Sequence, residues 1–455
     1  MRDFFKLIVL LVCGVLSVNG QNKPLLYDFD EIPQTMLLNP SVRPGYKAHI
    51  GIPLLSGIHF NAGLSEITVA DLFRNDNVDF NVKVRNAIDR VSVDDYVSFN
   101  HQIEVLSGSY RLNDKDFLSV GFYTEIDFFA NYPKDAIDLI NDGNAANLNR
   151  TFLVSQVNVK ADALSVLHVG LSRKINSQFT LGGRFKIYSG IANVTSTNNT
   201  GSFTTRLGQN NIYTHTINNL NFNGYSSGLY YENDITASDI VGKAFFSNLG
   251  LGFDIGFSYQ LDQQTKITAS LLDIGFVNYS SDIRNVTAKG DYTFSGIEFL
   301  YDSTNTNYWE NLNDDFKQQV PSEENEEAYS VMRPIKFNAS YKYGWGRSRN
   351  EENCSDMSYK EYYNNSIGAQ LFSVFRPTGP KFALTGFYER KLSGKINTKF
   401  TYTIDDFSYT NIGLGLSSKI GKFHVYGLVD NIFGLADIAD TNTASFQFGM
   451  NLIFK

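Results

Sequence analysis

Few of the residues that commonly carry out chemistry are grouped in this sequence. No HExxH metal motif, GxSxG nucleophile motif or Walker phosphate loop occurs. The histidines are scattered along the chain, at His49, His59, His101, His168, His215 and His424. His168, with Ser165 and Ser172 nearby, could form a hydrolase site, but a histidine in the wall of a β-protein explains the same residues. We therefore expect no enzyme, no cofactor and no metal centre.

An acidic run from Glu323 to Glu327 raises the question of calcium binding. Ca²⁺ takes several oxygen ligands, and this run consists of glutamates around Asn325. It lacks the regularly spaced Asp, Asn and Gly residues of a calcium loop, and runs of like charge are commonly solvated. We favour a solvated stretch, and the sequence leaves calcium binding there open.

The first twenty residues have the order of a secretory signal peptide. Arg2 and Lys6 precede an apolar run from Leu7 to Leu16, and small and polar residues follow. The apolar run has about ten residues, roughly half of what a helical membrane span needs. We expect residues 1–20 to be cleaved before Gln21, rather than to act as a membrane anchor or as a lipoprotein signal at Cys13.

The composition of the remaining chain excludes several classes of protein. Without Arg2, Lys6 and Asp3 the basic residues fall from 39 to 37 and the acidic residues from 47 to 46, a net charge of −9. An acidic chain lacks the basic surface that nucleic-acid binding needs. One cysteine, Cys354, remains, so no intramolecular disulfide can form. No later stretch has eighteen consecutive apolar residues, which excludes helical membrane spans.

Large apolar residues alternate with small or polar ones in many stretches of the chain. In the last eleven residues, one face of an extended strand carries Phe446, Phe448, Met450, Leu452 and Phe454. The run from Leu249 to Leu261 repeats the pattern, as does the run from Ile335 to Tyr343. The opposite faces of these two runs carry Asn248, Asp254, Gln260, Lys336, Asn338 and Lys342. Gly, Ser, Asn and charge on one face, with aromatic residues on the other, are typical of a barrel with lipid outside and a water-filled lumen inside.

Strand length separates a membrane barrel from a soluble sandwich. The run from Leu249 to Leu261 would extend about 43 Å and, tilted by about 40°, would rise roughly 33 Å, which exceeds the apolar band of about 25 Å. Because open sheet edges are not tolerated in a bilayer, the strands must close on themselves. We predict an all-β, antiparallel transmembrane barrel of 14 strands, within a range of 14–16.

Short and long connections alternate along the chain. Turn-like segments occur at 113–116, 174–177, 262–264, 393–395 and 420–422, and long polar stretches occur at about 65–98, 129–152, 190–247 and 300–332. This asymmetry is typical of periplasmic turns and extracellular loops. Two loop segments have helical spacing instead. The first is 135–148, and the second carries Tyr308, Leu312, Phe316 and Val320. Such an element is either a helix of a surface loop or a cap or plug for the barrel.

The segment before the first strand is a further candidate plug. Pro40 lacks an N–H and pushes Asn39 out of the helical region, so Leu38-Asn39-Pro40 is a rigid turn. Such a segment could tuck into the periplasmic end of the barrel, or could simply be the turn that enters the strand. We divide the chain into a signal peptide (1–20), a periplasmic or plug segment (21–45) and an outer-membrane barrel (46–455).

Several motifs resemble those of known outer-membrane barrels. Pro33-Gln34, Leu38-Asn39-Pro40 and the strand entry His49-Ile50-Gly51-Ile52-Pro53 resemble the opening of a family of Bacteroidota outer-membrane barrels with a domain of unknown function. The Asn-Pro box is also similar to that of the PorP/SprF barrels, although Ser41-Val42-Arg43 follows it here. The hairpin LHVGLSRKINSQFTLGGRFKIYSG looks like those of FadL- and PorV-type barrels.

These resemblances imply two classes of function. The first is a porin- or FadL-like conduit for a small solute, hydrophobic solutes included. The alternative is a PorP/SprF-like barrel that docks or assembles a secreted surface protein of the type IX secretion or gliding systems. In either case we expect the cell outer membrane as location. The expected partners are outer-membrane lipid, the barrel-assembly machinery and, for docking, a surface or periplasmic protein.

Overall fold

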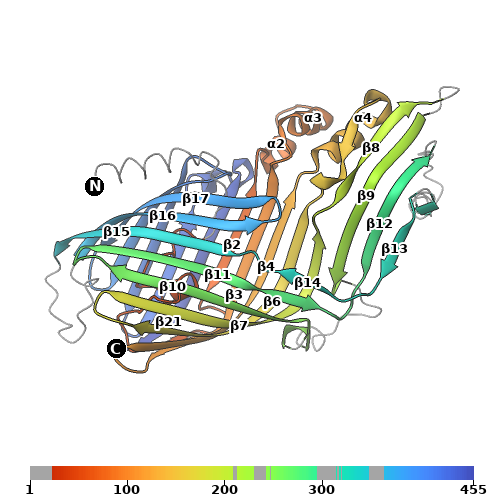
Figure 1. Ribbon diagram of the computed structural model, residues 1–455. Helices are drawn as coiled ribbons and strands as arrows, with labels where there is room; N and C mark the ends of the chain where they lie inside the picture. Colours follow the sequence, from red (N-terminus) through yellow and green to blue (C-terminus); the bar gives the residue numbers. More distant parts are fainter. Residues whose placement is uncertain are drawn as a thin grey trace, which may run out of the picture.

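The computed structural model of the protein consists of a β-barrel with a flared extension at one end (Figure 1). It describes residues 23–208, 213–229, 242–245, 247–294, 314, 317–318, 320–347 and 363–454. The predicted signal peptide, residues 1–20, lies outside the described residues. Among the residues described, no helix is long and apolar enough to cross a membrane.

Fourteen antiparallel strands close the barrel, as the sequence predicted. Two wall strands are each built from two segments, β1 with β2 and β14 with β15, and the seam pairs β1 and β2 with β21. In order around the wall the strands are β1 (Ala48–Gly51) with β2 (Ile58–Leu64), β3 (Tyr96–Arg111), β4 (Asp116–Asn131), β6 (Val159–Lys174), β7 (Phe179–Ser196), β10 (Leu249–Gln260), β11 (Thr265–Tyr279), β14 (Tyr329–Met332) with β15 (Lys336–Arg347), β16 (Tyr363–Arg376), β17 (Gly379–Lys391), β18 (Ile396–Ile404), β19 (Asn411–Ile420), β20 (Phe423–Asp430) and β21 (Thr443–Phe454).

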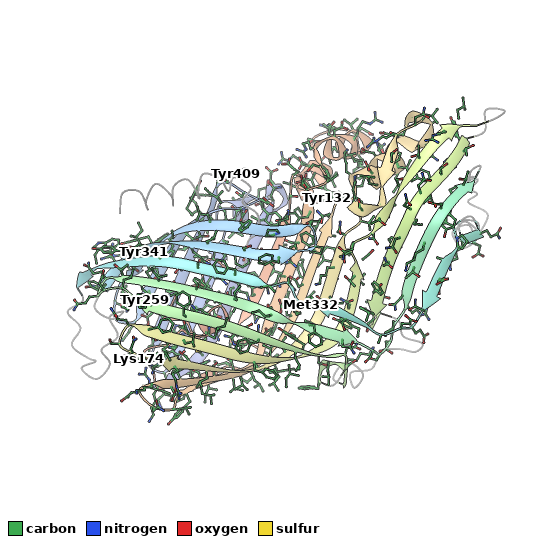
Figure 2. The ribbon with its side chains drawn as sticks, in the orientation of Figure 1. Tyr132, Lys174, Tyr259, Met332, Tyr341 and Tyr409 are labelled. Atoms are coloured by element: carbon green, nitrogen blue, oxygen red, sulfur yellow. The ribbon has the colours of Figure 1, made fainter. Side chains whose placement is uncertain are left out.

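The outward face of the wall is apolar. Along β10, the exposed residues Leu249, Leu251, Phe253 and Ile255 alternate with buried Gly and Asp residues. In β21, Phe446, Phe448, Met450, Leu452 and Phe454 lie on the outward face. Tyr341 on β15 is 49% exposed and lies on the same outer surface (Figure 2). A soluble protein rarely exposes so much contiguous apolar surface, so this face fits a bilayer.

The turns predicted from sequence all connect neighbouring wall strands at one end of the barrel, which we call the short-turn end. They join β3 to β4, β6 to β7, β10 to β11, β17 to β18 and β19 to β20. Lys174 lies at this end, whereas Tyr132 lies at the opposite, long-loop end (Figure 2). The long-loop end is uneven, because the β16–β17 connection there is also a short turn.

The long loops carry their own secondary structure. The β2–β3 loop forms α2 (Val69–Phe73) and α3 (Phe80–Arg90), and the predicted helical segment 135–148 is α4 (Lys134–Ala146). A five-stranded sheet extends the barrel at this end (Figure 1). Its strands are β5 (Thr151–Leu153), β8 (Thr200–Leu207), β9 (Tyr213–Ser227), β12 (Asn285–Phe294) and β13 (Ser322–Asn325).

Two wall strands are interrupted, and the structure satisfies the backbone at both places. Residues 52–57 leave the wall between β1 and β2, where Ile52 N–H donates to Met450 C=O (3.1 Å) and Met450 N–H donates to Leu55 C=O (2.8 Å). Between β14 and β15, Arg333 N–H donates to Gly275 C=O (2.9 Å). Since an unpaired backbone group in lipid costs several kcal/mol, these bonds let the wall bend within the membrane.

A charge placed on the outward face tests the orientation of the wall. Ile255 lies in the middle of β10 and is 39% exposed, so Ile255→Lys is expected to lower the free energy of unfolding by about 2–4 kcal/mol in lipid vesicles. Gln263→Lys, in the β10–β11 turn, is the control and should change it by less than about 0.5 kcal/mol. Urea titration of the folded barrel in vesicles measures both, and equal losses would contradict the assignment of the outer face.

Candidate functional site in the barrel interior

Residues 23–47, which we call the plug, lie inside the barrel (Figure 1). Within it Pro33–Leu37 forms a short 3₁₀ helix, with Pro33 in the first turn, where its missing N–H costs no hydrogen bond. The apolar side chains of the plug pack against Leu272, Tyr426 and Leu428 of the wall. The plug residues of this cluster are Leu25, Leu26, Tyr27, Phe29, Ile32 and Leu38. The plug therefore supplies most of the side chains of this apolar cluster.

The Leu38-Asn39-Pro40 turn is buried against two neighbouring strands. Asn39 Oδ1 accepts hydrogen bonds from the amide (3.0 Å) and hydroxyl (2.8 Å) of Ser41. A Cβ added to Gly182 on β7 would lie 2.2 Å from Pro40, and one added to Gly256 on β10 would lie 2.2 Å from Asn39 Oδ1. These glycines therefore give the turn room to approach the wall. The interpretation of the glycine-rich polar faces as the lining of a water-filled lumen was wrong at these positions.

Charged side chains of the wall also hold the plug. Lys266 on β11 pairs with Asp28 (3.2 Å) and Asp30 (3.2 Å), and Lys391 at the end of β17 pairs with Glu31 (2.9 Å). Beside these pairs, a cavity of about 110 Å³ opens towards the short-turn end. Its charged lining includes Asp30, Glu31, Arg43, Lys266, Lys342 and Glu389.

A network of buried ion pairs, which we call the central network, continues from the plug towards the long-loop end. It connects inward-facing side chains of β4, β6, β7, β10, β11 and the β14–β15 strand. The pairs are Arg184–Asp254 (3.0 Å), Lys186–Asp254 (2.9 Å), Lys186–Asp273 (2.5 Å), Lys336–Asp273 (3.0 Å), Lys336–Glu125 (3.3 Å), Arg333–Glu125 (3.0 Å) and Arg333–Asp162 (3.3 Å).

A bulge in β11 places one member of this network. The register between β10 and β11 shifts at Leu272 and Asp273, and Asp273 has a positive φ of 60°. Its amide, which the bulge removes from the ladder, donates to Asp254 Oδ1 (2.7 Å). Both Leu272 and Asp273 consequently lie inside the barrel, the first against the plug and the second in the network.

The central network joins strands that are not neighbours in the wall. Glu125 on β4 contacts Lys336 on β15, and Asp127 on β4 binds Arg376, at the end of β16, through two bonds (2.5 and 3.1 Å). Removing one partner of such a buried pair typically costs about 3–5 kcal/mol, because the other charge stays buried and unpaired. The interior is therefore closed by cross-connections as well as by the plug.

The residues predicted to face the lumen have different surroundings. Asp254 and Lys336 belong to the central network, and Lys342 donates to Asp28 C=O (3.1 Å) in the plug. Asn338 is 2% exposed and lies 3.4 Å from Ser270 Oγ. Two of the set have local roles near the strand ends. Asn248 donates to Gly190 C=O (3.2 Å), and Gln260 donates to Asp262 C=O (2.9 Å).

The other candidate residues are accounted for by structure. Tyr308, Leu312 and Phe316 lie outside the described residues, whereas Val320 packs with Ile217 and Leu220 in the extension. The acidic run is exposed, and Glu324 pairs with Lys317 (3.0 Å).

The serine and histidine residues considered for hydrolysis are not bonded to one another. His168 is buried and, in the part of the chain that the structure describes, neither of its ring nitrogens has a hydrogen-bond partner. Ser172 instead donates to Ser41 C=O (3.0 Å), in the plug. No three His, Cys, Asp or Glu side chains of the described chain come together as a metal site.

The β18–β19 loop folds over the long-loop mouth of the barrel. Phe407 is buried against Tyr96, with ring centroids 5.1 Å apart, and Asp406 pairs with Lys381 (3.6 Å). Burial raises the pKa of Asp405 to about 7 and that of Asp406 to about 6. Both carboxyls are therefore partly protonated near neutral pH.

These raised pKa values predict how stability depends on pH. A carboxyl whose pKa is raised by folding stabilises the fold below its unfolded pKa, and this contribution is lost as the pH rises through the folded pKa. The free energy of unfolding should therefore fall between pH 5 and pH 8. In the variant Asp405→Asn, the decrease in the free energy of unfolding over this pH range should be smaller. Urea unfolding at several pH values measures it. An unchanged slope in the variant would contradict the burial of Asp405.

The glycines under the Asn-Pro turn give a matched test of the plug. Gly256→Val is expected to push the turn off the wall, because overpacking typically costs about 1–3 kcal/mol. Trypsin should then cleave after Lys47 roughly tenfold faster or more. Gly386→Val is the control, since a Cβ there meets no atom within 4 Å. Equal protection of the plug in both variants would contradict its contact with Gly256.

Comparisons with known proteins found solved structures of low similarity and one family model. The chain is similar in structure to the toluene transporter TodX of Pseudomonas putida (8% identity, TM-score 0.39, 96% of this chain and 97% of that chain covered). It is also similar to a FadL homologue of Pseudomonas aeruginosa (8% identity, TM-score 0.41, 92% of this chain and 93% of that chain covered). A third similar structure is the translocator domain of the autotransporter NalP of Neisseria meningitidis (7% identity, TM-score 0.33, 91% of each chain covered). At such TM-scores the likeness says nothing about activity. No curated protein matches the chain. A model of a family of unknown function, DUF5723, matches residues 40–430, and the protein belongs to this family.

Proposed function

We propose that this protein is an outer-membrane conduit for a small solute, hydrophobic solutes included, which reaches the outer membrane after cleavage of residues 1–20. The observation that carries the proposal is an apolar cluster on the inward faces of β4, β6, β7, β11 and β14. It consists of Tyr123, Leu164, Val166, Tyr188, Val277, Tyr279 and Val331, with Leu37 of the plug packed against it. When the plug moves, this apolar strip would line a path for a solute that the charged network alone would repel.

The chemistry of the closed interior supports a conduit that opens. Buried ion pairs contribute little net stability compared with apolar residues of the same volume, so they are a poor way to build a permanent core. The plug is attached to the wall by hydrogen bonds, ion pairs and packing, with no covalent cross-link among the described residues. Movement of the plug would therefore break no covalent bond, although it would expose part of the apolar cluster as well as exchange polar contacts for water.

The interruption between β1 and β2 supports passage along the wall. Leu54 and Leu55 are 56% and 41% exposed on the lipid side, and Gly57 lies on the inner side against Gln34 of the plug. At this place the regular pairing of the wall strand with its neighbours is interrupted next to the plug. A hydrophobic solute would need such a connection between interior and bilayer.

The Asn-Pro box, which motivated the docking alternative, is used inside the barrel. Asn39 is fully buried and contacts Ser41 and the wall, so the box does not form a surface for a secreted partner. No observation on the described residues favours the docking alternative, and the relationship to the PorP/SprF barrels has no further support.

A disulfide that locks the plug tests the proposal. Ser41 Oγ lies 2.7 Å from Ser258 Oγ on β10, so Ser41→Cys with Ser258→Cys should cross-link plug and wall in a Cys354→Ser background. The measurement is the rate at which the hydrophobic dye N-phenyl-1-naphthylamine enters cells that carry the protein in an outer membrane with lipopolysaccharide. We expect oxidation to reduce entry to the rate of cells without the protein, and dithiothreitol to restore it.

The control cross-links two wall strands that are already paired. Thr385 Oγ1 on β17 lies 2.9 Å from Thr403 Oγ1 on β18, and Thr385→Cys with Thr403→Cys should leave dye entry unchanged under oxidation. The proposal fails if the wild-type protein does not accelerate entry, or if the locked plug admits dye as fast as the reduced one.

A further inference from the structure

The wall is short on one side of the barrel. Strands β18, β19 and β20 have nine, ten and eight residues, whereas β3, β4 and β6 have sixteen each. At about 3.3 Å per residue and a tilt of about 40°, β20 rises roughly 20 Å, but the apolar band of an outer membrane is about 25 Å thick. Phe423, the first residue of β20, is already exposed on the outward face. The bilayer beside β20 therefore extends as far as the loop that follows the strand.

The β20–β21 loop, which follows this short strand, exposes large apolar side chains. Phe433 is 69% exposed, and Leu435 and Ile438 are exposed as well. The start of the loop is fixed, because the amide of Asn431 donates a hydrogen bond to Asn411 Oδ1 (2.7 Å). The fold therefore holds these three apolar side chains outside any core.

The β2–β3 loop lies beside the β20–β21 loop and adds further apolar side chains. Arg74, directly after α2, pairs with Asp440 of the β20–β21 loop (2.8 Å). On α2, Val69 and Phe73 lie one helical turn apart and are both exposed, and the ring centroid of Phe73 is 6.0 Å from that of Phe80 on α3. A surface helix normally turns apolar residues towards a core and polar residues towards water, so this exposure indicates an apolar environment.

The lipid-facing wall continues into these two loops. On the outward face, the ring centroid of Phe60 on β2 lies 5.3 Å from that of Phe99 on β3 and 6.2 Å from that of Phe446 on β21. All three residues are three or four positions from the long-loop end of their strands. Tyr409, in the β18–β19 loop, is exposed at the edge of the barrel, away from the five-stranded sheet (Figure 2). Tyrosine is enriched where hydrocarbon meets water, so the aromatic residues mark this boundary close to the loops.

We propose that the β2–β3 and β20–β21 loops lie in the outer leaflet of the membrane and contact its acyl chains. The contacting residues, which we call the rim surface, are Val69, Phe73, Phe433, Leu435 and Ile438. Lipid fits this surface better than a protein partner does, because the surface continues the lipid-facing wall and begins where the wall is too short for the apolar band. Amphipathic segments at a membrane surface bury their apolar face about 5–10 Å into the boundary between headgroups and acyl chains. The inference rests on the outer-membrane location and does not depend on whether a solute passes through the barrel.

Tryptophan fluorescence in proteoliposomes tests this contact. In a background with Trp309→Phe and Trp345→Phe, Phe73→Trp or Phe433→Trp supplies a single tryptophan, and the lipid is phosphatidylcholine brominated in the upper part of its acyl chains. We expect bromine to reduce the emission of both variants by about half or more, and aqueous iodide to leave it nearly unchanged. Leu207→Trp is the matched control, because Leu207 is also exposed (58%) but belongs to β8 of the extension. Its emission should fall with iodide and not with bromine.

A tryptophan on the wall separates this inference from the membrane location itself. Ile255→Trp, in the middle of β10, should be quenched by lipid brominated near the ends of its acyl chains. If Phe433→Trp does not fold, Ile438→Trp takes its place. The inference is overturned if Ile255→Trp is quenched by bromine while the loop tryptophans respond only to iodide, which would place the loops in water. It is also overturned if neither bromine nor iodide reaches the loop tryptophans, because a second copy or another protein segment would then cover them. If bromine quenches neither wall nor loops, the outer-membrane location fails as well.

Discussion

Every backbone amide that crosses a bilayer must find a hydrogen-bond partner within the protein, and this requirement shapes the whole molecule. It forces the sheet to close between β1 and β21, so the wall has no free edge within the membrane. In barrels of about eight strands, the side chains of the wall fill the interior. A wall of fourteen strands encloses more space than its own side chains can fill. The chain therefore needs something inside, and it supplies the plug and the central network.

The interior combines two kinds of interaction with different consequences. Leu25, Tyr27 and Phe29 bury apolar surface, which is non-directional and tolerant of small shifts. Arg184, Lys186 and Arg333 act through ion pairs that depend on geometry and lose much of their value when a partner moves. The first kind holds the plug in the barrel, and the second ties neighbouring wall strands together and, through Arg333, also connects the β14–β15 strand with β4 and β6.

Strand periodicity was sufficient to predict the wall, because Leu249, Leu251 and Phe253 alternate with inward residues over the full length of β10. The tight turns were equally clear from their polar residues. The contacts of the plug could not be predicted from the sequence, because Leu25, Leu26 and Tyr27 follow no strand or helix period and their partners are far away in sequence. Gly182 and Gly256 were also misinterpreted, because a glycine on the inner face of a strand is compatible both with a water-filled lumen and with a segment packed closely against the wall.

The seam between β1 and β21 has a consequence for assembly. Gln34 in the plug donates to Glu104 on β3 and to Asn451 on β21, and the second contact joins residues 417 positions apart. Contacts between such distant parts of a chain form slowly, since a large loop must first be ordered. The interior is completed by β21, so a chain in which β21 has not yet paired has neither a sealed cylinder nor a fully anchored plug.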